Sequence, residues 1–129
     1  SSFLAVISES ELLALHAWHN ENNDHSLALQ MLYLAISKGT IRDPKAESRN
    51  YGFASGSLRK SFRLDEAKAF ASLALVLNPS NVDAKYNLAL IYKLMGKSVE
   101  AKNIALEVMK YNNSYYNRRL REEFPEFRE

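Results

Sequence analysis

The chain has 129 residues, of which 47% are hydrophobic, four are glycine, three are proline and none is cysteine. This length fits one domain with a single core, and the scarcity of glycine and proline argues against a turn-rich β protein and favours helices. The lack of cysteine excludes disulfides, thiolate metal sites and cysteine nucleophiles. Because 17 basic residues nearly balance 15 acidic ones, the net charge does not favour nucleic acid or an anionic membrane as a partner. No apolar run reaches the roughly 20 residues of a membrane span.

The amino-terminal third predicts two helices joined by a polar turn. Ser8 and Glu11 have the spacing of a capping box, which opens a helix over residues 9–20. Residues 22–24 form the turn, and Gly39 closes the second helix. We therefore expect a helical hairpin at this end of the chain.

The middle of the chain predicts a second helical hairpin. Its first helix is expected over residues 46–62. Its second helix starts at Asp65 and ends at Leu77, because the following Pro79 disfavours helical geometry in the residue before it.

The last part of the chain predicts a third hairpin and a final helix. Asn81 caps a helix that runs to Leu94, Gly96 stops it, and Ser98 caps the partner helix. A helix over residues 114–124 then carries apolar groups on one face and charges on the other. Such a polar-faced helix is suited to covering the end of a stack.

A repeat relates these hairpins. Residues 65–67 align with residues 99–101, and a run similar to that at Ala67 begins at Ala28, at a slightly longer offset. A two-helix unit cannot bury its own apolar stripe, so repeated units stack into one core. We predict a single all-α domain over residues 1–129, with repeats at about 9–42, 48–81 and 82–113 and a capping helix at about 114–124.

The third repeat resembles a tetratricopeptide repeat. The family's signature positions are occupied by Leu88, Ala89, Tyr92, Gly96 and Ala101. The second repeat matches in its second half, through Ala67, Ala74 and Pro79. The resemblance implies a right-handed superhelical stack of about three helix-turn-helix repeats.

The first repeat departs from that pattern. Ala28 and Ala35 fit, but His16 falls on the position of a small residue. Residues 35–39 and the irregular spacing also resemble Sel-like repeats, a related family of helical hairpins. Either the register differs in this repeat, or its first helix packs abnormally.

In the tetratricopeptide family, the first helices of successive repeats line a concave groove that binds partner proteins. The resemblance places eight candidate residues in such a groove: Arg49, Gly52, Gly56, Arg59, Lys60, Tyr86, Leu90 and Lys93. The basic groups would attract carboxylates, and Tyr86 and Leu90 would act as apolar anchors. The alternative is that these charges form an ordinary solvated face.

Two of these residues are glycines spaced i, i+4 within one predicted helix. Each of Gly52 and Gly56 costs roughly 1 kcal/mol relative to alanine. Their shared face indicates that something needs the space, either a bound peptide or a neighbouring helix.

No catalytic or metal site is expected. His16 and His19 could approach one ion, but no third ligand has suitable spacing, so structural histidines are favoured. No nucleophile triad, phosphate loop or paired carboxylate motif occurs. We therefore expect no enzyme activity, no metal and no cofactor, and we assign Trp18 to the buried face of its helix.

One cluster near the carboxyl end leaves two interpretations open. Its members are Tyr111, Tyr115, Tyr116, Arg118, Arg119 and Arg121. Aromatic and basic groups together can stack and hold single-stranded nucleic acid. They can equally form the contact between the last repeat and its cap, and we favour the cap.

The favoured function is a protein–protein interaction or scaffold module that binds a peptide segment or partner subunit. By likeness to bacterial repeat proteins, an envelope or secretion assembly is one setting. One alternative is an RNA-binding helical-repeat protein that uses the basic middle of the chain, residues 42–81, and the tyrosine and arginine cluster near the carboxyl end. The other is a self-assembling structural subunit that pairs through residues 3–7. The chain begins Ser1-Ser2 without a methionine, which indicates a processed or excised fragment, and no targeting segment is visible in it. The lack of cysteine fits a reducing cytoplasm and a disulfide-free bacterial periplasm equally, so the compartment stays unknown.

Overall fold

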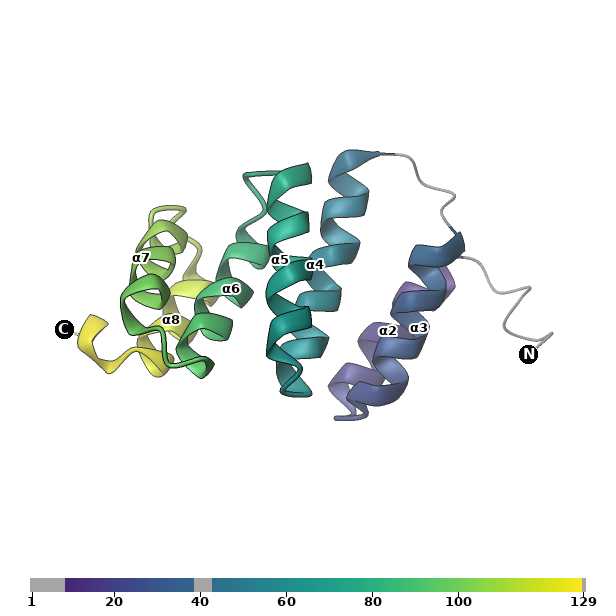
Figure 1. The fold of residues 1–129 in the computed structure, drawn as a ribbon, viewed down its shortest axis with the longest axis horizontal. Coiled ribbons are helices and arrows are strands. Elements are labelled where there is room, and N and C mark those ends of the chain that lie inside the picture. The colour runs from purple at the N-terminus through teal and green to yellow at the C-terminus, as the bar shows by residue number, and fades with distance from the viewer. Residues whose placement is uncertain (1–8, 39–42, 129) are drawn as a thin grey trace.

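The computed structural model describes residues 9–38 and 43–128, which form seven α-helices and one short 3-10 helix, without strands (Figure 1). The elements are α2 (Glu9–Glu21), α3 (His25–Lys38), α4 (Pro44–Lys60), α5 (Leu64–Leu77), α6 (Val82–Leu94), α7 (Ser98–Met109), α8 (Ser114–Glu123) and η1 (Pro125–Phe127). The predicted all-α class is confirmed for these residues.

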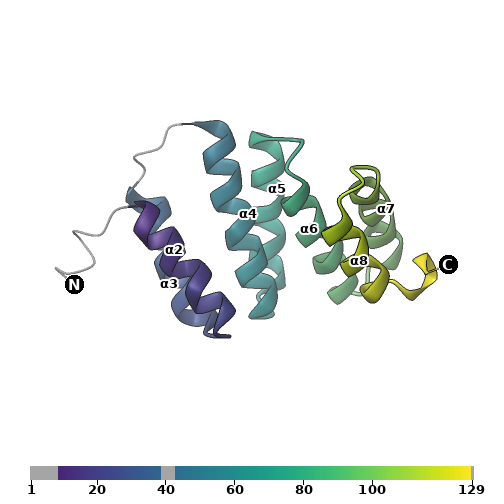
Figure 2. The ribbon, with the colours of Figure 1, turned by 180° about the vertical axis from the view of Figure 1, so that it is seen from behind.

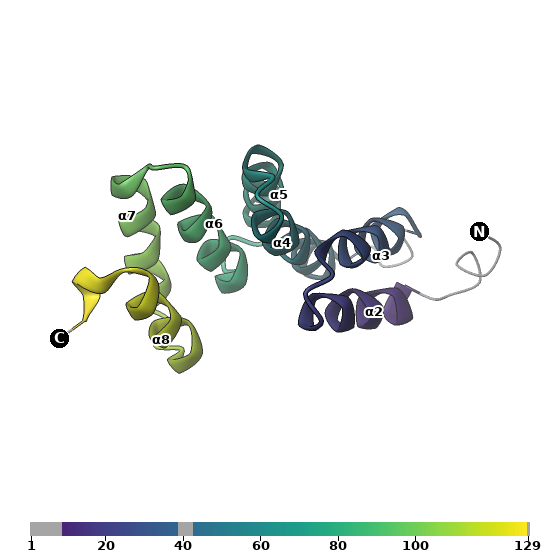
Figure 3. The same ribbon diagram turned by 90° about the horizontal axis from the view of Figure 1, so that it is seen from below.

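The helices pair as three hairpins that follow one another along the molecule. α2 packs on α3, α4 on α5, and α6 on α7. Between hairpins, α3 contacts α4, and α6 contacts both α4 and α5 (Figures 1 and 2). The view from below in Figure 3 shows α2 and α8 on the same side of α4 and α6. Four helices therefore border one side of the molecule.

The three hairpin turns share one hydrogen bond across the end of the first helix. The amide of Asp24 donates to the carbonyl of His19 (2.8 Å), and that of Lys97 donates to Tyr92 (2.9 Å). In the middle hairpin the amide of Arg63 donates to Leu58 (2.9 Å). The residues that accept these bonds are His19, Leu58 and Tyr92. Their separations along the chain equal the offsets at which the repeats align in the sequence. The repeat in the sequence is therefore a repeat of turn geometry.

One residue in each of these turns has a positive φ. It is Asn23 (61°) in the first hairpin, Phe62 (60°) in the second and Gly96 (78°) in the third. Asparagine and glycine tolerate this left-handed geometry, whereas it costs a bulky residue on the order of 1 kcal/mol. The side chain of Phe62 is also 73% exposed, so burial does not offset that cost.

Small buried residues bring the helices close together. Ala28, Ala35, Ala67, Ala74, Ala101 and Ala105 are fully buried. Around them, one cluster includes Leu29 of α3, Leu58 of α4, Ala71 of α5 and Leu88 of α6, and so joins three hairpins. Burying a leucine side chain stabilises a fold by about 1.5–3 kcal/mol. This shared core holds neighbouring hairpins against each other.

The predicted helix starts were partly right. Asn81 caps α6, since its side chain accepts a hydrogen bond from the amide of Ala84 (3.0 Å). The prediction that Ser98 caps the next helix was wrong: Ser98 is the first residue of α7, and Lys97 precedes it without a side-chain cap. The α4 helix begins at Pro44, earlier than expected, because Asp43 caps it. The predicted roles of Ser8 and Gly39 lie outside the described residues.

The apolar face of α8, together with the residue that follows the helix, is buried against α6 and α7. Leu120 is fully buried and Phe124 is 3% exposed, in one cluster with Tyr86 and Ala89 of α6. Phe124 also stacks on Phe127 of η1, with ring centres 5.5 Å apart. The final helix therefore covers α6 and forms one wall of the region described next.

Candidate functional site

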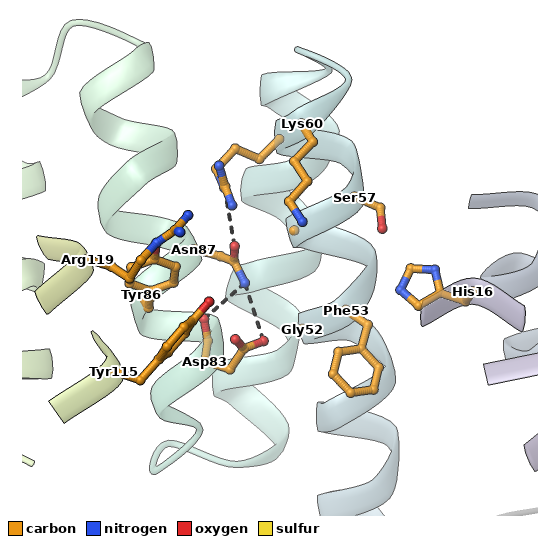
Figure 4. Close-up of a pocket in the computed structure, with 12 residues that line it drawn as sticks. His16, Gly52, Phe53, Ser57, Lys60, Asp83, Tyr86, Asn87, Tyr115 and Arg119 are labelled. Atoms are coloured by element: carbon orange, nitrogen blue, oxygen red, sulfur yellow. Dashed lines mark hydrogen bonds between the residues drawn. The ribbon is translucent and has the colours of Figure 1, made fainter. Parts of the chain in front are cut away.

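A cleft of about 170 Å³ lies between α4 and α6 and reaches α2 and α8 (Figure 4). Its α4 side is formed by Gly52, Gly56, Arg59 and Lys60, and its α6 side by Asp83, Tyr86 and Asn87. His16 of α2 and Tyr115 and Arg119 of α8 also line it. We call it the first cleft.

The two glycines let α6 side chains approach α4. A Cβ atom on Gly56 would lie 3.3 Å from Oδ1 of Asn87, and one on Gly52 would lie 3.4 Å from Nδ2 of Asn81. Both glycines therefore face the neighbouring helix and also line the cleft. The contact at Gly56 is closer than an ordinary one and that at Gly52 is ordinary, so helix packing explains Gly56 but does not require Gly52.

Asn87 organises the polar floor of the first cleft. Its amide nitrogen donates to the carbonyl of Asp83 (3.1 Å) and reaches its carboxylate (3.4 Å). Its amide oxygen accepts a hydrogen bond from Nε of Arg59 (3.2 Å). Figure 4 shows this chain of contacts from α4 to α6. Because Asn87 is fixed by Asp83, it also fixes the guanidinium of Arg59.

The carboxylate of Asp83 is held by α8. The hydroxyl of Tyr116 donates to it at 3.0 Å. Burial raises the pKa of Asp83, while the Tyr116 hydrogen bond and the charges of Arg59 and Lys60 act in the opposite direction. The acid is thus already engaged by Tyr116 and Asn87.

Three cations converge on the first cleft. Burial lowers the pKa of Arg59, and burial together with Arg59 and Arg119 lowers the pKa of Lys60. Arg119 donates from Nε to the hydroxyl of Tyr86 (3.4 Å) and lies 5.9 Å from the ring centre of Tyr115. Within the described part of the chain, none of the three forms an ion pair with a carboxylate. The cleft therefore presents positive charge that its one lining acid, Asp83, does not match.

A second cleft of about 240 Å³ adjoins the first and shares Arg59 and Lys60 with it. Its further lining residues are Phe62, Leu90, Lys93, Leu94 and Glu123. Lys93 is paired with Glu123, through a carboxylate oxygen at 3.3 Å and the backbone carbonyl. Phe62 is 73% and Leu94 is 46% exposed, so this cleft offers apolar surface beside basic groups.

Seven of the eight residues predicted to line a groove lie in these two clefts. Arg49 lines neither of them and is exposed elsewhere on α4. Tyr86 and Leu90 are only 5% and 4% exposed, because α8 and its neighbours pack over α6. Little of either side chain is therefore accessible for the expected role as an apolar anchor. Phe62 was missed, although it occupies the turn position that Gly96 occupies in the next hairpin.

His16 of α2 packs into the fold and also lines the first cleft. His16 is buried, and its Nδ1 lies 2.9 Å from the carbonyl of Ala28. Burial lowers the pKa of His16, and the nearby charge of Lys60 lowers it further, against the effect of the Ala28 hydrogen bond. In the described ranges, no group of three or more histidine, aspartate or glutamate side chains is arranged to hold a metal ion.

Trp18 corrects one prediction from the sequence. It was assigned to the buried face of its helix, but the residue is 57% exposed. Its one aromatic neighbour among the described residues is the adjacent His19, in an edge-to-face contact. The α2 helix has apolar residues on all sides, so its sequence pattern does not select one face.

Neither a protein-family model nor a curated protein matches the chain. No helix among the described residues is both long enough and apolar enough to cross a membrane.

Proposed function

We propose that the chain is a tetratricopeptide-like interaction module that binds a segment of a partner protein along α4, α6 and α8. The hairpins would form the right-handed stack that the resemblance implies. The observation that carries this proposal is the convergence of Arg59, Lys60 and Arg119 on a cleft where none of them has an ion pair among the described residues. A partner carboxylate would supply the missing charge.

A binding role is favoured over catalysis. His16 lines the first cleft, but its Nδ1 is engaged with the carbonyl of Ala28 and burial opposes its protonation. A general acid–base group needs a pKa near the working pH and access to the reacting atoms. We therefore place the chain among scaffold proteins, with a bacterial envelope or secretion assembly as one setting.

The test is capture of partners from a source lysate with two charge-matched variants. Lys60→Glu with Arg119→Glu reverses two charges in the first cleft. Lys45→Glu with Arg118→Glu reverses two exposed charges that line neither cleft. Arg59 is left intact because its bond to Asn87 contributes to the cleft floor.

A partner protein that is lost only with the first variant, and that resists nuclease, supports the proposal. Equal capture by both variants contradicts the assignment of the cleft. Sedimentation of the purified chain at several concentrations separates this result from self-assembly, which would shift the mass upward.

RNA binding is the second candidate, and one observation favours it. Tyr111 and Tyr115 are 44% and 51% exposed, with Lys85 5.4 Å from the first ring centre and Arg119 5.9 Å from the second. Exposed aromatic rings beside cations can stack bases. An RNA complex would weaken steeply as salt rises, and its capture would be nuclease-sensitive.

A further inference from the structure

Phe62 is a bulky, exposed residue at a turn position that requires a positive φ. It has a positive φ of 60° at a turn position where the other hairpins use Asn23 and Gly96. Its ring is 73% exposed and belongs to none of the buried clusters found in the described residues. A strained residue without burial is a reason to look for a binding role.

The surroundings of Phe62 indicate what such a contact would involve. Phe62 and Leu94 lie in the second cleft, which shares Arg59 and Lys60 with the first. An exposed aromatic ring is therefore placed directly beside the cations. Aromatic residues, phenylalanine included, and arginine are enriched in protein interfaces relative to the rest of the surface.

We propose that the partner segment is an acidic peptide with a large apolar side chain, which packs on Phe62 and Leu94 while a neighbouring carboxylate binds Arg59, Lys60 and Arg119. This inference rests on the proposed function and names its ligand class. The carboxylate and the apolar group are close in the partner's sequence, because Arg59 and Lys60 line both clefts. Arg59, Lys60 and Arg119 would repel a basic peptide.

The test uses short labelled peptides and fluorescence anisotropy. The first contains Asp-Glu-Leu-Phe-Glu-Asp between glycine and serine. The second replaces Leu-Phe by Ser-Gly, the third replaces the acids by their amides, and the fourth replaces them by lysine. All four are amidated, and a free-carboxyl form of the third distinguishes a terminal carboxylate from acidic side chains.

The acidic–apolar peptide is expected to bind at least about tenfold more tightly than each of the other three amidated peptides. Phe62→Gly is expected to weaken that peptide about tenfold and to leave the acidic peptide without Leu-Phe unchanged. Val76→Ala removes a comparably exposed apolar side chain from α5 and should have no effect. Glycine suits the backbone of position 62, so a loss in this variant does not reflect unfolding.

Three results would overturn the inference: no saturable binding of the acidic–apolar peptide up to about 1 mM, equal binding of the four amidated peptides, or an unchanged affinity in Phe62→Gly. Tighter binding of a labelled oligouridine would also overturn it and favour nucleic acid. If lysate capture depends on Lys60 and Arg119 while the peptides show no preference, the ligand class is wrong and the proposed function stands. If capture is equal in both charge variants, the proposed function itself fails.

Discussion

The hydroxyl of Tyr116 in α8 lies 3.0 Å from the carboxylate of Asp83 in α6 and donates a hydrogen bond to it. This bond joins the capping helix to the floor of the first cleft. Burial is the largest cause of the raised pKa of Asp83, and burial together with the Asp83 charge raises the pKa of Tyr116. Asp83 is therefore already hydrogen-bonded to Tyr116, whereas the cations of the first cleft remain able to bind a carboxylate of a ligand.

Tyr116→Phe is expected to destabilise the protein by about 1–2 kcal/mol at neutral pH, because a largely buried carboxylate loses a charge-assisted hydrogen bond. Urea unfolding measures this loss. Tyr115→Phe is the control, because Tyr115 is 51% exposed. Removal of its hydroxyl group should change the free energy of unfolding by less than about 0.5 kcal/mol. An equal loss of unfolding free energy in the two variants would show that the hydrogen bond from Tyr116 to Asp83 does not stabilise the fold.

His16→Asn tests the pH dependence that follows from burial. The folded-state pKa of His16 lies below 6.5, so the folded protein disfavours its protonation. The neutral ring of His16 therefore contributes fully to the free energy of unfolding above pH 6.5. This contribution is lost as the pH falls from 6.5 through the pKa of His16 in the folded state. Asparagine can still donate to the carbonyl of Ala28 but does not titrate.

Urea unfolding of both proteins between about pH 7.5 and pH 5.5 measures this effect. Wild type should lose more stability than His16→Asn over that interval. Contributions from Asp83 and other groups common to both proteins cancel in the difference. Parallel curves would contradict a buried, neutral His16.

The two glycines, Gly52 and Gly56, are expected to respond differently to the same substitution by alanine. Gly52→Ala should stabilise the protein by about 0.5–1 kcal/mol, because its new methyl group meets Asn81 at ordinary contact distance. Gly56→Ala should be less stable than Gly52→Ala by about 1 kcal/mol, since its methyl group would press on Asn87, which hydrogen bonds hold in place. Thermal unfolding of the two variants decides this, and a more stable Gly56→Ala would contradict the packing account.

Phe62→Gly is expected to stabilise the chain by about 1 kcal/mol, because glycine adopts a positive φ without strain and little buried area is lost. Thermal and urea unfolding measure the change. A destabilised variant would mean that the ring contributes to the fold, and would remove the reason to assign it a binding role.

The hairpins could be predicted from the sequence because their signals are local. Asn81 caps the helix that directly follows it, and Gly96 supplies the positive φ of the turn at that helix's other end. The Ser98 prediction failed because several residues near a helix start can cap it, and the backbone here begins the helix at Ser98 itself.

The candidate site was predictable only in part. The i, i+4 spacing placed Gly52, Gly56 and Lys60 on one face, and the structure brings them to one cleft. The burial of Tyr86 depends on how α8 crosses α6, which no local pattern encodes. Phe62 was missed because turn chemistry predicts glycine or asparagine at such a position, and its exposure depends on the tertiary arrangement.

Amide chemical-shift mapping of the isotope-labelled chain with the acidic–apolar peptide tests whether a partner segment binds along α4, α6 and α8. We expect shifts concentrated on the second half of α4, on α6 and on α8, centred on Lys60 and Arg119, and we expect these shifts to be lost in Lys60→Glu with Arg119→Glu. Shifts confined to α5 and α7, or unchanged by that variant, would contradict binding along these helices.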